Sequence, residues 1–148
     1  MKEKDTAKGI PILLVEDDEN DILITKRAFE RYNFSNDLFV TRDGEEALEF
    51  IYRRGDFDGE DIPEPGLILL DINMPRMNGI EVLRLLKNDP QKKHIPVVML
   101  TTSRRDQDMI ESYNLGVNSY IVKPVDFAKF LEAISTINLY WSLNQLPE

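Results

Sequence analysis

The sequence contains no cysteine and a single histidine, His94. The absence of cysteine excludes disulfide bonds, thiolate zinc sites and thiol nucleophiles. One histidine is too few for a histidine-rich metal site or for the paired-histidine motifs of zinc hydrolases. Because His94 precedes an apolar run rather than following it, we expect it on the surface, at the wrong edge of a sheet for catalysis.

Positive charge is also scarce. The 148 residues include 18 Lys and Arg against 27 Asp and Glu, a net charge of −9 at pH 7. This balance disfavours nucleic-acid binding, which needs a basic surface to neutralise phosphates, and it disfavours docking on an anionic membrane. No apolar run approaches the roughly 20 residues of a membrane span, and the opening MKEKDTAKG lacks the apolar core of a signal peptide. We expect a cytoplasmic protein whose partners include neither nucleic acid nor membrane.

Hydrophobic residues make up 42% of the chain, which is enough for one globular domain with a full core. We expect a polar N-terminal tail over residues 1–8 and a single domain over residues 9–138. Residues 139–148 would extend the last helix. The sequence shows no repeat, no low-complexity tract and no second domain.

Short apolar runs alternate with segments of helical periodicity. The expected strands are residues 10–15, 38–41, 67–70, 97–100 and 119–122. The expected helices are residues 18–32, a segment opening at 43–44, residues 78–88, residues 106–115 and a segment from about 126. Runs that are apolar throughout are typical of parallel strands buried on both faces. Five strand–helix units in series therefore predict an α/β fold, with one parallel sheet between two layers of helices.

The segment 53–66, RRGDFDGEDIPEPG, is long for a connection in such a compact domain. It contains three Gly, two Pro and five acidic residues, a composition typical of loops. We expect a solvated, mobile insertion.

Polar residues stand at the carboxyl ends of four of the expected strands. Parallel α/β sheets bind their ligands outside this edge, where the strand ends converge. Polar groups without a function would not be expected to gather there. The set comprises Glu16-Asp17-Asp18, Asp71, Thr101-Thr102 and Lys123-Pro124.

Three of these groups, Glu16, Asp17 and Asp71, are carboxylates that would meet without a counterion. Two carboxylates about 4 Å apart repel by about 4 kcal/mol at an effective dielectric constant of about 20. Such a cluster needs a cation, and hard oxygen ligands without His or Cys select Mg²⁺, Mn²⁺ or Ca²⁺. Mg²⁺ is favoured because it typically binds through one or two carboxylates together with phosphate oxygens and water.

Lys123 adds a positive charge to this edge, and Thr101 adds a hydroxyl donor. Together with a metal, these groups form a clamp for a phosphoryl group. Asp71 would be the nucleophile, because a carboxylate can form an aspartyl phosphate. Asp17 and Asp18 could instead simply cap the following helix, since acids are favoured at a helix N-terminus. The presence of polar groups at three further strand ends favours the functional interpretation.

Four segments resemble the receiver domain of two-component response regulators. They are ILLVEDDEND at 12–21, LILLDINMPRMNG at 67–79, PVVMLTTS at 96–103 and LGVNSYIVKPVD at 115–126. Each contains a strand end, they occur in the family's order, and they cover the chain from about residue 9 to the last helix. The resemblance implies a flavodoxin-like (βα)5 three-layer sandwich with strand order 2-1-3-4-5.

The resemblance also implies a role for each acidic residue. Asp71 is then the phosphoacceptor. Mg²⁺, or Mn²⁺ in its place, is held by the side chains of Asp17 and Asp71 and by the backbone carbonyl of Asn73. Glu16 stands where the family usually has an acid that acts through a water on the metal.

The remaining site residues take their roles from the same resemblance. Lys123 contacts the phosphoryl group, and Thr101 and Tyr120 form a switch pair that rearranges when the phosphoryl group arrives. The bond between Lys123 and Pro124 is expected to be cis, which X–Pro bonds permit at modest free-energy cost.

The implied function is that of a phosphoprotein in a phosphorelay. A sensor histidine kinase, or a small phosphodonor, supplies the phosphoryl group to Asp71, and the phosphorylated face then contacts a downstream protein. The chain is not expected to be an enzyme, because its own chemistry is limited to self-phosphorylation and slow autodephosphorylation.

Finer features resemble the single-domain regulators that pair with phytochrome-type histidine kinases. They are the acidic segment before the third strand, the run SYNLGVNSY and the tail LYWSLNQLP. In the tail, Tyr140, Trp141 and Leu143 either pack on the body of the domain or form a homodimer contact. We favour the dimer, because aromatic residues are enriched in interface cores.

Three alternatives belong to other classes. A haloacid dehalogenase-type phosphohydrolase also uses a strand-end Asp, a Lys and a Thr or Ser, but it needs a second acid two residues on, where this chain has Asn73. A flavodoxin binds an anionic phosphate after its first strand, and the acidic run EDDEND would repel that group. A degenerate receiver would act only as a binding scaffold, and the complete set of acids, Thr and Lys argues against it.

Overall fold

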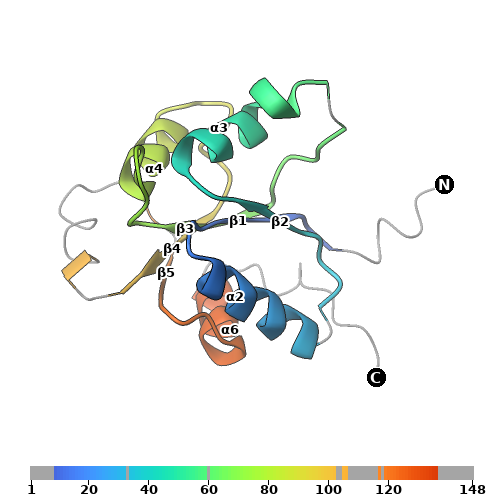
Figure 1. Ribbon diagram of the computed structural model, residues 1–148, viewed down its shortest axis with the longest axis vertical. Coiled ribbons are helices and arrows are strands. Elements are labelled where there is room, and N and C mark those ends of the chain that lie inside the picture. The colour runs from blue at the N-terminus through green and yellow to red at the C-terminus, as the bar shows by residue number, and fades with distance from the viewer. Residues whose placement is uncertain are drawn as a thin grey trace.

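The computed structural model describes residues 9–32, 34–59, 61–102, 105–106, 117 and 119–136, whose arrangement is shown in Figure 1. Within these residues the strands are β1 (Ile12–Val15), β2 (Leu38–Thr41), β3 (Leu67–Asp71), β4 (Val97–Thr101) and β5 (Ser119–Val122). The helices are α2 (Glu19–Arg31), α3 (Gly44–Tyr52), α4 (Gly79–Lys87) and α6 (Phe127–Thr136), with a 3₁₀ turn, η1 (Gly55–Phe57), after α3.

The described strands form one parallel sheet in the order β2-β1-β3-β4-β5, which confirms the predicted topology. Val15 at the end of β1 pairs with Thr41 on one side and with Leu70 on the other. Asp71, one residue further along β3, pairs with Leu100. The carboxyl ends of the central strands are therefore level with one another, and the residues that follow them lie side by side.

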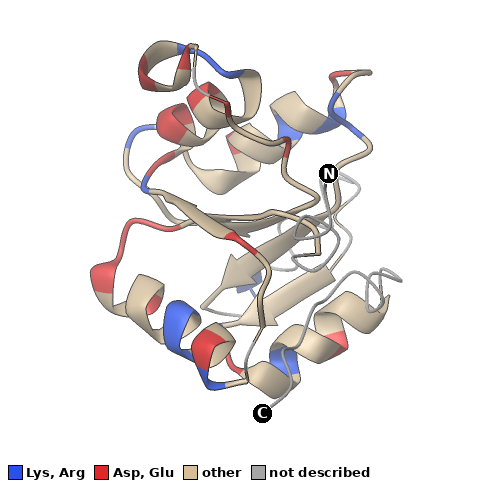
Figure 2. Cartoon of the chain, turned by 90° about the vertical axis from the view of Figure 1, so that its right-hand side faces the viewer, with Lys and Arg blue, Asp and Glu red and all other residues tan. Residues whose placement is uncertain are grey.

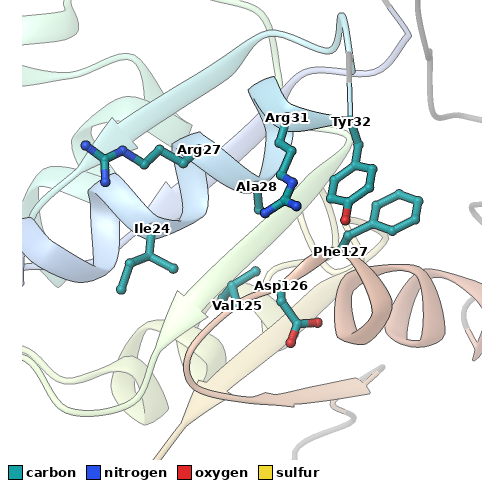
Figure 3. A pocket seen from close by; sticks show the side chains of 8 residues that line it. All are labelled: Ile24, Arg27, Ala28, Arg31, Tyr32, Val125, Asp126 and Phe127. Carbon is teal, nitrogen blue, oxygen red and sulfur yellow. The ribbon is translucent and has the colours of Figure 1, made fainter.

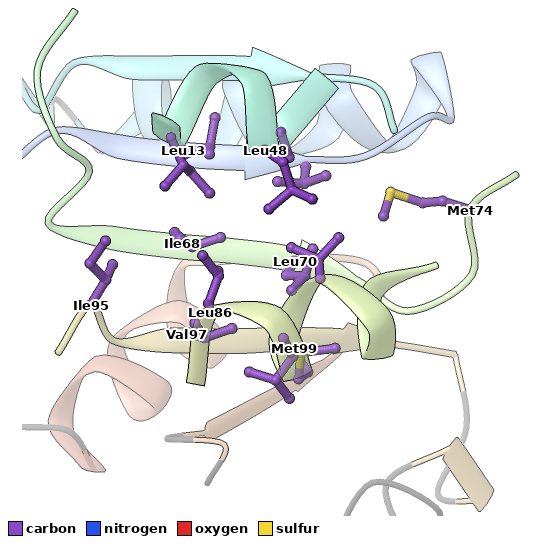
Figure 4. Packing of buried hydrophobic residues seen from close by; sticks show 14 of the residues in the cluster. Leu13, Leu48, Ile68, Leu70, Met74, Leu86, Ile95, Val97 and Met99 are labelled. Atoms are coloured by element: carbon purple, nitrogen blue, oxygen red, sulfur yellow. The ribbon is translucent and has the colours of Figure 1, made fainter. Parts of the chain in front are cut away.

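Successive residues of each strand point to opposite faces of the sheet, so the apolar runs supply two cores. Leu13 and Leu70 belong to the core that includes α3 and α4, whereas Leu14 and Leu69 belong to the core that includes α2 and α6. Figure 1 shows these helix pairs on opposite sides of the sheet, and Figure 4 shows side chains of the first core. Each of these four leucines is fully buried, and burying one contributes about 1.5–3 kcal/mol.

Polar side chains mark the starts of the helices. Asp18, Asp43 and Asn78 are the N-caps of α2, α3 and α4, and each accepts a hydrogen bond from the backbone N–H three residues on. Asp126 makes the same contact at the start of α6. Each such cap stabilises its helix by about 1 kcal/mol. The helix starts predicted at these positions are confirmed.

Two strands include the polar residue that was expected to follow them. Asp71 is the last residue of β3 and Thr101 the last of β4, because both are paired across the sheet. At the other end, the strand predicted from residue 10 begins at Ile12, whose N–H bonds to the Asp37 carbonyl. Pro11 has no N–H to donate.

The prediction that the segment 53–66 is a solvated insertion was wrong for part of the segment. Phe57 and Ile62 pack against the core beside α3, and Pro65 is buried. Glu64 lies 3.0 Å from the Lys92 ammonium and 3.2 Å from the ring of His94. His94 itself is exposed, as predicted. The mobility of the segment stays a prediction.

Charged residues lie mainly on the helices and the connecting segments (Figure 2). Asp71 is the one charged residue within the described strands. Among the described residues, no helix combines the length and the apolar character needed to cross a membrane. The helix predicted over 106–115 extends beyond the described residues, and the tail at 139–148 lies outside them.

Candidate functional site

Three carboxylates meet at the carboxyl edge of the sheet. Glu16 and Asp17 directly follow β1, and Asp71 ends β3, which lies next to β1. One oxygen from each of the three lies within 4.8 Å of the others. Glu16 and Asp71 are 1% and 2% exposed, whereas Asp17 is open to solvent. The prediction that Glu16, Asp17 and Asp71 meet at one edge of the sheet is therefore confirmed.

The Lys123 side chain reaches this cluster from the segment after β5. Its ammonium lies 2.8 Å from Glu16 Oε1 and 3.0 Å from Asp71 Oδ1. Burial acts to lower the pKa of Lys123, but the two carboxylates outweigh it and the pKa is raised. The lysine therefore stays charged and supplies a fixed positive group beside Asp71.

One ammonium does not compensate both buried acids. Burial raises the pKa of Glu16 to about 7, against the opposing contact with Lys123, and repulsion from Asp71 adds to the rise. Burial also raises the pKa of Asp71, again against the contact with Lys123. Burial is the main cause of both rises, and the single ammonium of Lys123 among three carboxylates does not offset it, which leaves a shortage of positive charge at the site. The oxygen-only donor set and this shortage fit a hard divalent cation.

Thr101, the predicted switch hydroxyl, is fully buried at the end of β4. Its Oγ1 donates to Asp106 Oδ2 at 3.2 Å. The exposed side-chain amide of Asn73 donates to the same oxygen at 3.5 Å. Sequence reasoning missed Asp106, because it stands five residues beyond a strand end and no strand-end rule includes it.

Tyr120 and Thr101 lie on adjacent strands. Met99 pairs with Tyr120 and Thr101 with Val122, so Tyr120 lies two residues before the level of Thr101 and on the same face of the sheet. The tyrosine is half-buried and packs against the α3–α4 core. The bond between Lys123 and Pro124 is cis, as predicted.

Asp21 is a second acid that the sequence prediction missed. It lies in the first turn of α2, and its Oδ2 is 3.2 Å from the Lys123 ammonium. The contact joins residues 102 positions apart in the chain. No local pattern marks it, because the contact depends on how α2 crosses the sheet.

Gly79 lies directly behind the Asp71 backbone. Its N–H donates to the Ile72 carbonyl at 2.9 Å. A Cβ at this position would lie 2.1 Å from the Asp71 carbonyl oxygen. Glycine is therefore required for α4 to begin this close to the end of β3, and the prediction of a structural role for Asn78-Gly79 is confirmed.

A separate groove of about 260 Å³ lies between α2 and the start of α6 (Figure 3). Its apolar part includes Ile24 and the stacked rings of Tyr32 and Phe127, whose centroids are 3.9 Å apart. Arg27 and Arg31 also line it. None of the predicted site residues lines this groove, so the acidic edge is the candidate site.

Comparisons with known proteins agree with this geometry. The response regulator receiver domain family matches residues 12–135. Response regulator Rcp1 of Synechocystis sp. is 38% identical over 130 residues, which cover 88% of this chain and 87% of Rcp1. A solved Mn²⁺-bound form of Rcp1 has a TM-score of 0.71 and covers 90% of this chain and 94% of its own.

Two further solved structures are similar. The bacteriophytochrome response regulator AtBRR is 42% identical with a TM-score of 0.87, and the match covers 94% of this chain and 98% of AtBRR. The phosphorylated cyanobacterial phytochrome response regulator RcpA is 36% identical with a TM-score of 0.72, over 90% of this chain and 94% of RcpA. With the matched residues, the strand order and the acidic edge in agreement, this chain belongs to the response regulator receiver domain family.

Proposed function

We propose that this response regulator accepts a phosphoryl group on Asp71 from the phosphohistidine of a sensor histidine kinase. The observation that carries the proposal is the position of the Lys123 ammonium, 3.0 Å from Asp71 Oδ1, beside the carboxylates of Glu16 and Asp17. A buried nucleophile next to a fixed cation, with further oxygen ligands within reach, suits phosphoryl transfer.

Asp17, Asp71 and the Asn73 backbone carbonyl would hold Mg²⁺ or Mn²⁺, with Glu16 acting through water. When bound, the cation supplies the positive charge that the cluster lacks. The oxygen-only donor set supports this assignment, as does the Mn²⁺-bound form of the relative Rcp1.

In the transfer step, an Asp71 carboxylate oxygen forms a bond to phosphorus. The bond between phosphorus and the donor imidazole nitrogen breaks, and its electron pair stays with that nitrogen. Lys123 neutralises charge on the phosphoryl oxygens. Thr101 then exchanges its present acceptor for a phosphoryl oxygen, and Tyr120 moves toward the space that Thr101 vacates.

The test is incubation of the full chain with acetyl phosphate and Mg²⁺, followed by intact mass measurement. The wild-type protein should gain one phosphoryl group, and Asp71→Asn should gain none. Asp18→Asn is the matched control, because it removes an adjacent carboxylate while Asn remains a good helix cap. Label that survives in Asp71→Asn, or that is absent from the wild type, contradicts the proposal.

The kinase type and the output are finer parts of the same proposal. Similarity to AtBRR and RcpA supports a phytochrome-type kinase as the donor. Phosphotransfer to this chain should be faster from a phytochrome-type kinase than from an unrelated kinase at equal concentration. We also propose that the output is a protein contact in trans, with homodimerisation through the tail. Light scattering of wild type and Trp141→Ala would test the dimer.

A further inference from the structure

Three carboxylates surround the Lys123 ammonium, at 2.8 Å from Glu16, 3.0 Å from Asp71 and 3.2 Å from Asp21. The ammonium has three N–H donors and gives one of them to Asp21 Oδ2, whereas Glu16 Oε1 accepts no hydrogen bond among the described residues. A phosphoryl oxygen on Asp71 therefore competes with Asp21 for the lysine.

Exposure decides which contact gives way. The side chains of Glu16 and Asp71 are 1% and 3% exposed, and that of Asp21 is 30% exposed. Asp71 itself becomes the acyl phosphate, so the choice lies between Glu16 and Asp21, and a buried Glu16 carboxylate that lost the ammonium would bear the full desolvation penalty. Water can solvate the Asp21 carboxylate once it is released, and its contact is already the longest of the three.

We propose that Asp21 is a positioning residue that occupies one N–H of Lys123 until the phosphoryl group takes it. The inference rests on the proposed function of Asp71 and Lys123. Asp21 then competes with the phosphoryl group, so it lowers the affinity of the site for that group. Phosphorylation would also detach the first turn of α2 from the segment after β5, because the Asp21–Lys123 contact joins the two.

The side chain of Asp21 can be changed without disturbing the helix cap. Its backbone N–H bonds to Asp18 Oδ1 and its carbonyl accepts from Thr25 Oγ1, and neither contact uses the carboxylate. Glu19 offers a matched control in the same turn. It pairs with Arg42 at 2.8 Å, and among the described residues Lys123 forms its ion pairs with Glu16, Asp21 and Asp71 and not with Glu19. Glu19→Gln therefore removes the same charge without freeing the lysine.

The experiment is calorimetric titration of the full chain with beryllofluoride, an analogue of the phosphoryl group, at saturating Mg²⁺. Loss of a partly exposed ion pair should tighten binding by about two- to fivefold in Asp21→Asn. Glu19→Gln should bind like the wild type, and Asp21→Glu should restore wild-type affinity. Thermal unfolding followed by circular dichroism checks that each variant is folded.

A second measurement needs no variant. In the wild-type protein, the NMR signal of the Asp21 side-chain carboxyl should shift toward a solvated value when beryllofluoride binds, and that of Lys123 Nζ should change with it. The inference would be overturned if Glu19→Gln tightened beryllofluoride binding as much as Asp21→Asn, or if Asp21→Asn weakened it. An Asp21 carboxyl NMR signal that does not change when beryllofluoride binds would overturn it too. A wild-type protein that binds no beryllofluoride would overturn the proposed function as well.

Discussion

Gly79 lies against the backbone of Asp71, so the start of α4 packs directly on the end of β3, where the phosphoacceptor candidate stands. A Cβ at residue 79 would lie 2.1 Å from the Asp71 carbonyl oxygen and 3.0 Å from Ile72 Cα. Real Cβ atoms do not approach backbone so closely, and neither atom belongs to a flexible side chain that could move away.

Gly79→Ala should therefore destabilise the fold by about 3 kcal/mol, through displacement of α4 from the end of β3. Urea unfolding measures the loss. Gly59→Asn is the control, because a Cβ at residue 59 would meet nothing within 4 Å and Asn tolerates the positive φ there. Wild-type stability in Gly79→Ala would show that α4 can move without cost.

Asp17 and Asp18 are adjacent acids with different roles. Mg²⁺ should raise the melting temperature of the wild type by mass action. Asp17→Ala should lose most of that response, because it removes the exposed carboxylate of the cluster. Asp18→Ala should lose about 1 kcal/mol of stability through the cap of α2 and keep the response.

Melting curves in EDTA and across millimolar Mg²⁺ distinguish the two variants. A wild-type melting temperature that ignores Mg²⁺ would indicate that the acidic cluster binds no metal. Equal responses of the two variants would remove the special role assigned to Asp17.

The raised pKa of Glu16 predicts an unusual pH dependence. Its pKa is about 7 in the folded protein against an ordinary value of 4.5, so the folded state binds the proton more tightly than the unfolded state. This group's contribution is fully present below about pH 4.5 and is lost as the pH rises toward 7. Asp71 acts in the same direction.

In metal-free buffer, the free energy of unfolding of the wild type should fall between about pH 5 and pH 7 relative to Glu16→Gln, by on the order of 2 kcal/mol. Mg²⁺ should shrink the difference, because a cation favours the ionised carboxylate. Urea unfolding at several pH values, with EDTA or Mg²⁺, measures both effects. Parallel pH profiles for the two proteins would argue against a raised pKa at Glu16.

The packed part of the segment after α3 should contribute to stability. The ring of Phe57 lies 5.3 Å from that of Phe50 in an edge-to-face arrangement. Phe57→Ala should therefore lower the free energy of unfolding by about 2 kcal/mol, with Asp58→Ala, an exposed neighbour, near neutral. If Phe57→Ala were as stable as the wild type, the result would favour the solvated insertion that the sequence predicted.

The fold was predictable because the strands are apolar at most positions and a capping residue stands at the start of α2, α3, α4 and α6. Leu67 to Leu70 form an apolar run of strand length, which is typical of a parallel strand buried on both faces. Asp18, Asp43 and Asn78 are local signals that need no distant partner. The sequence prediction was wrong where a tertiary contact overrode composition. Phe57 is surrounded by Gly and acids in the sequence, yet it packs on Phe50.

The candidate site divides in the same way. The sequence by itself determined that Glu16, Asp17, Asp71, Thr101 and Lys123 gather at one edge, because parallel strands in one sheet must end together and each of these residues stands at a strand end. Only the tertiary structure decided that Asp21 contacts Lys123 and that Asp106 contacts Thr101. Those contacts depend on how a helix and a connecting segment are placed over the edge, and that placement results from packing across the whole core rather than from any local pattern.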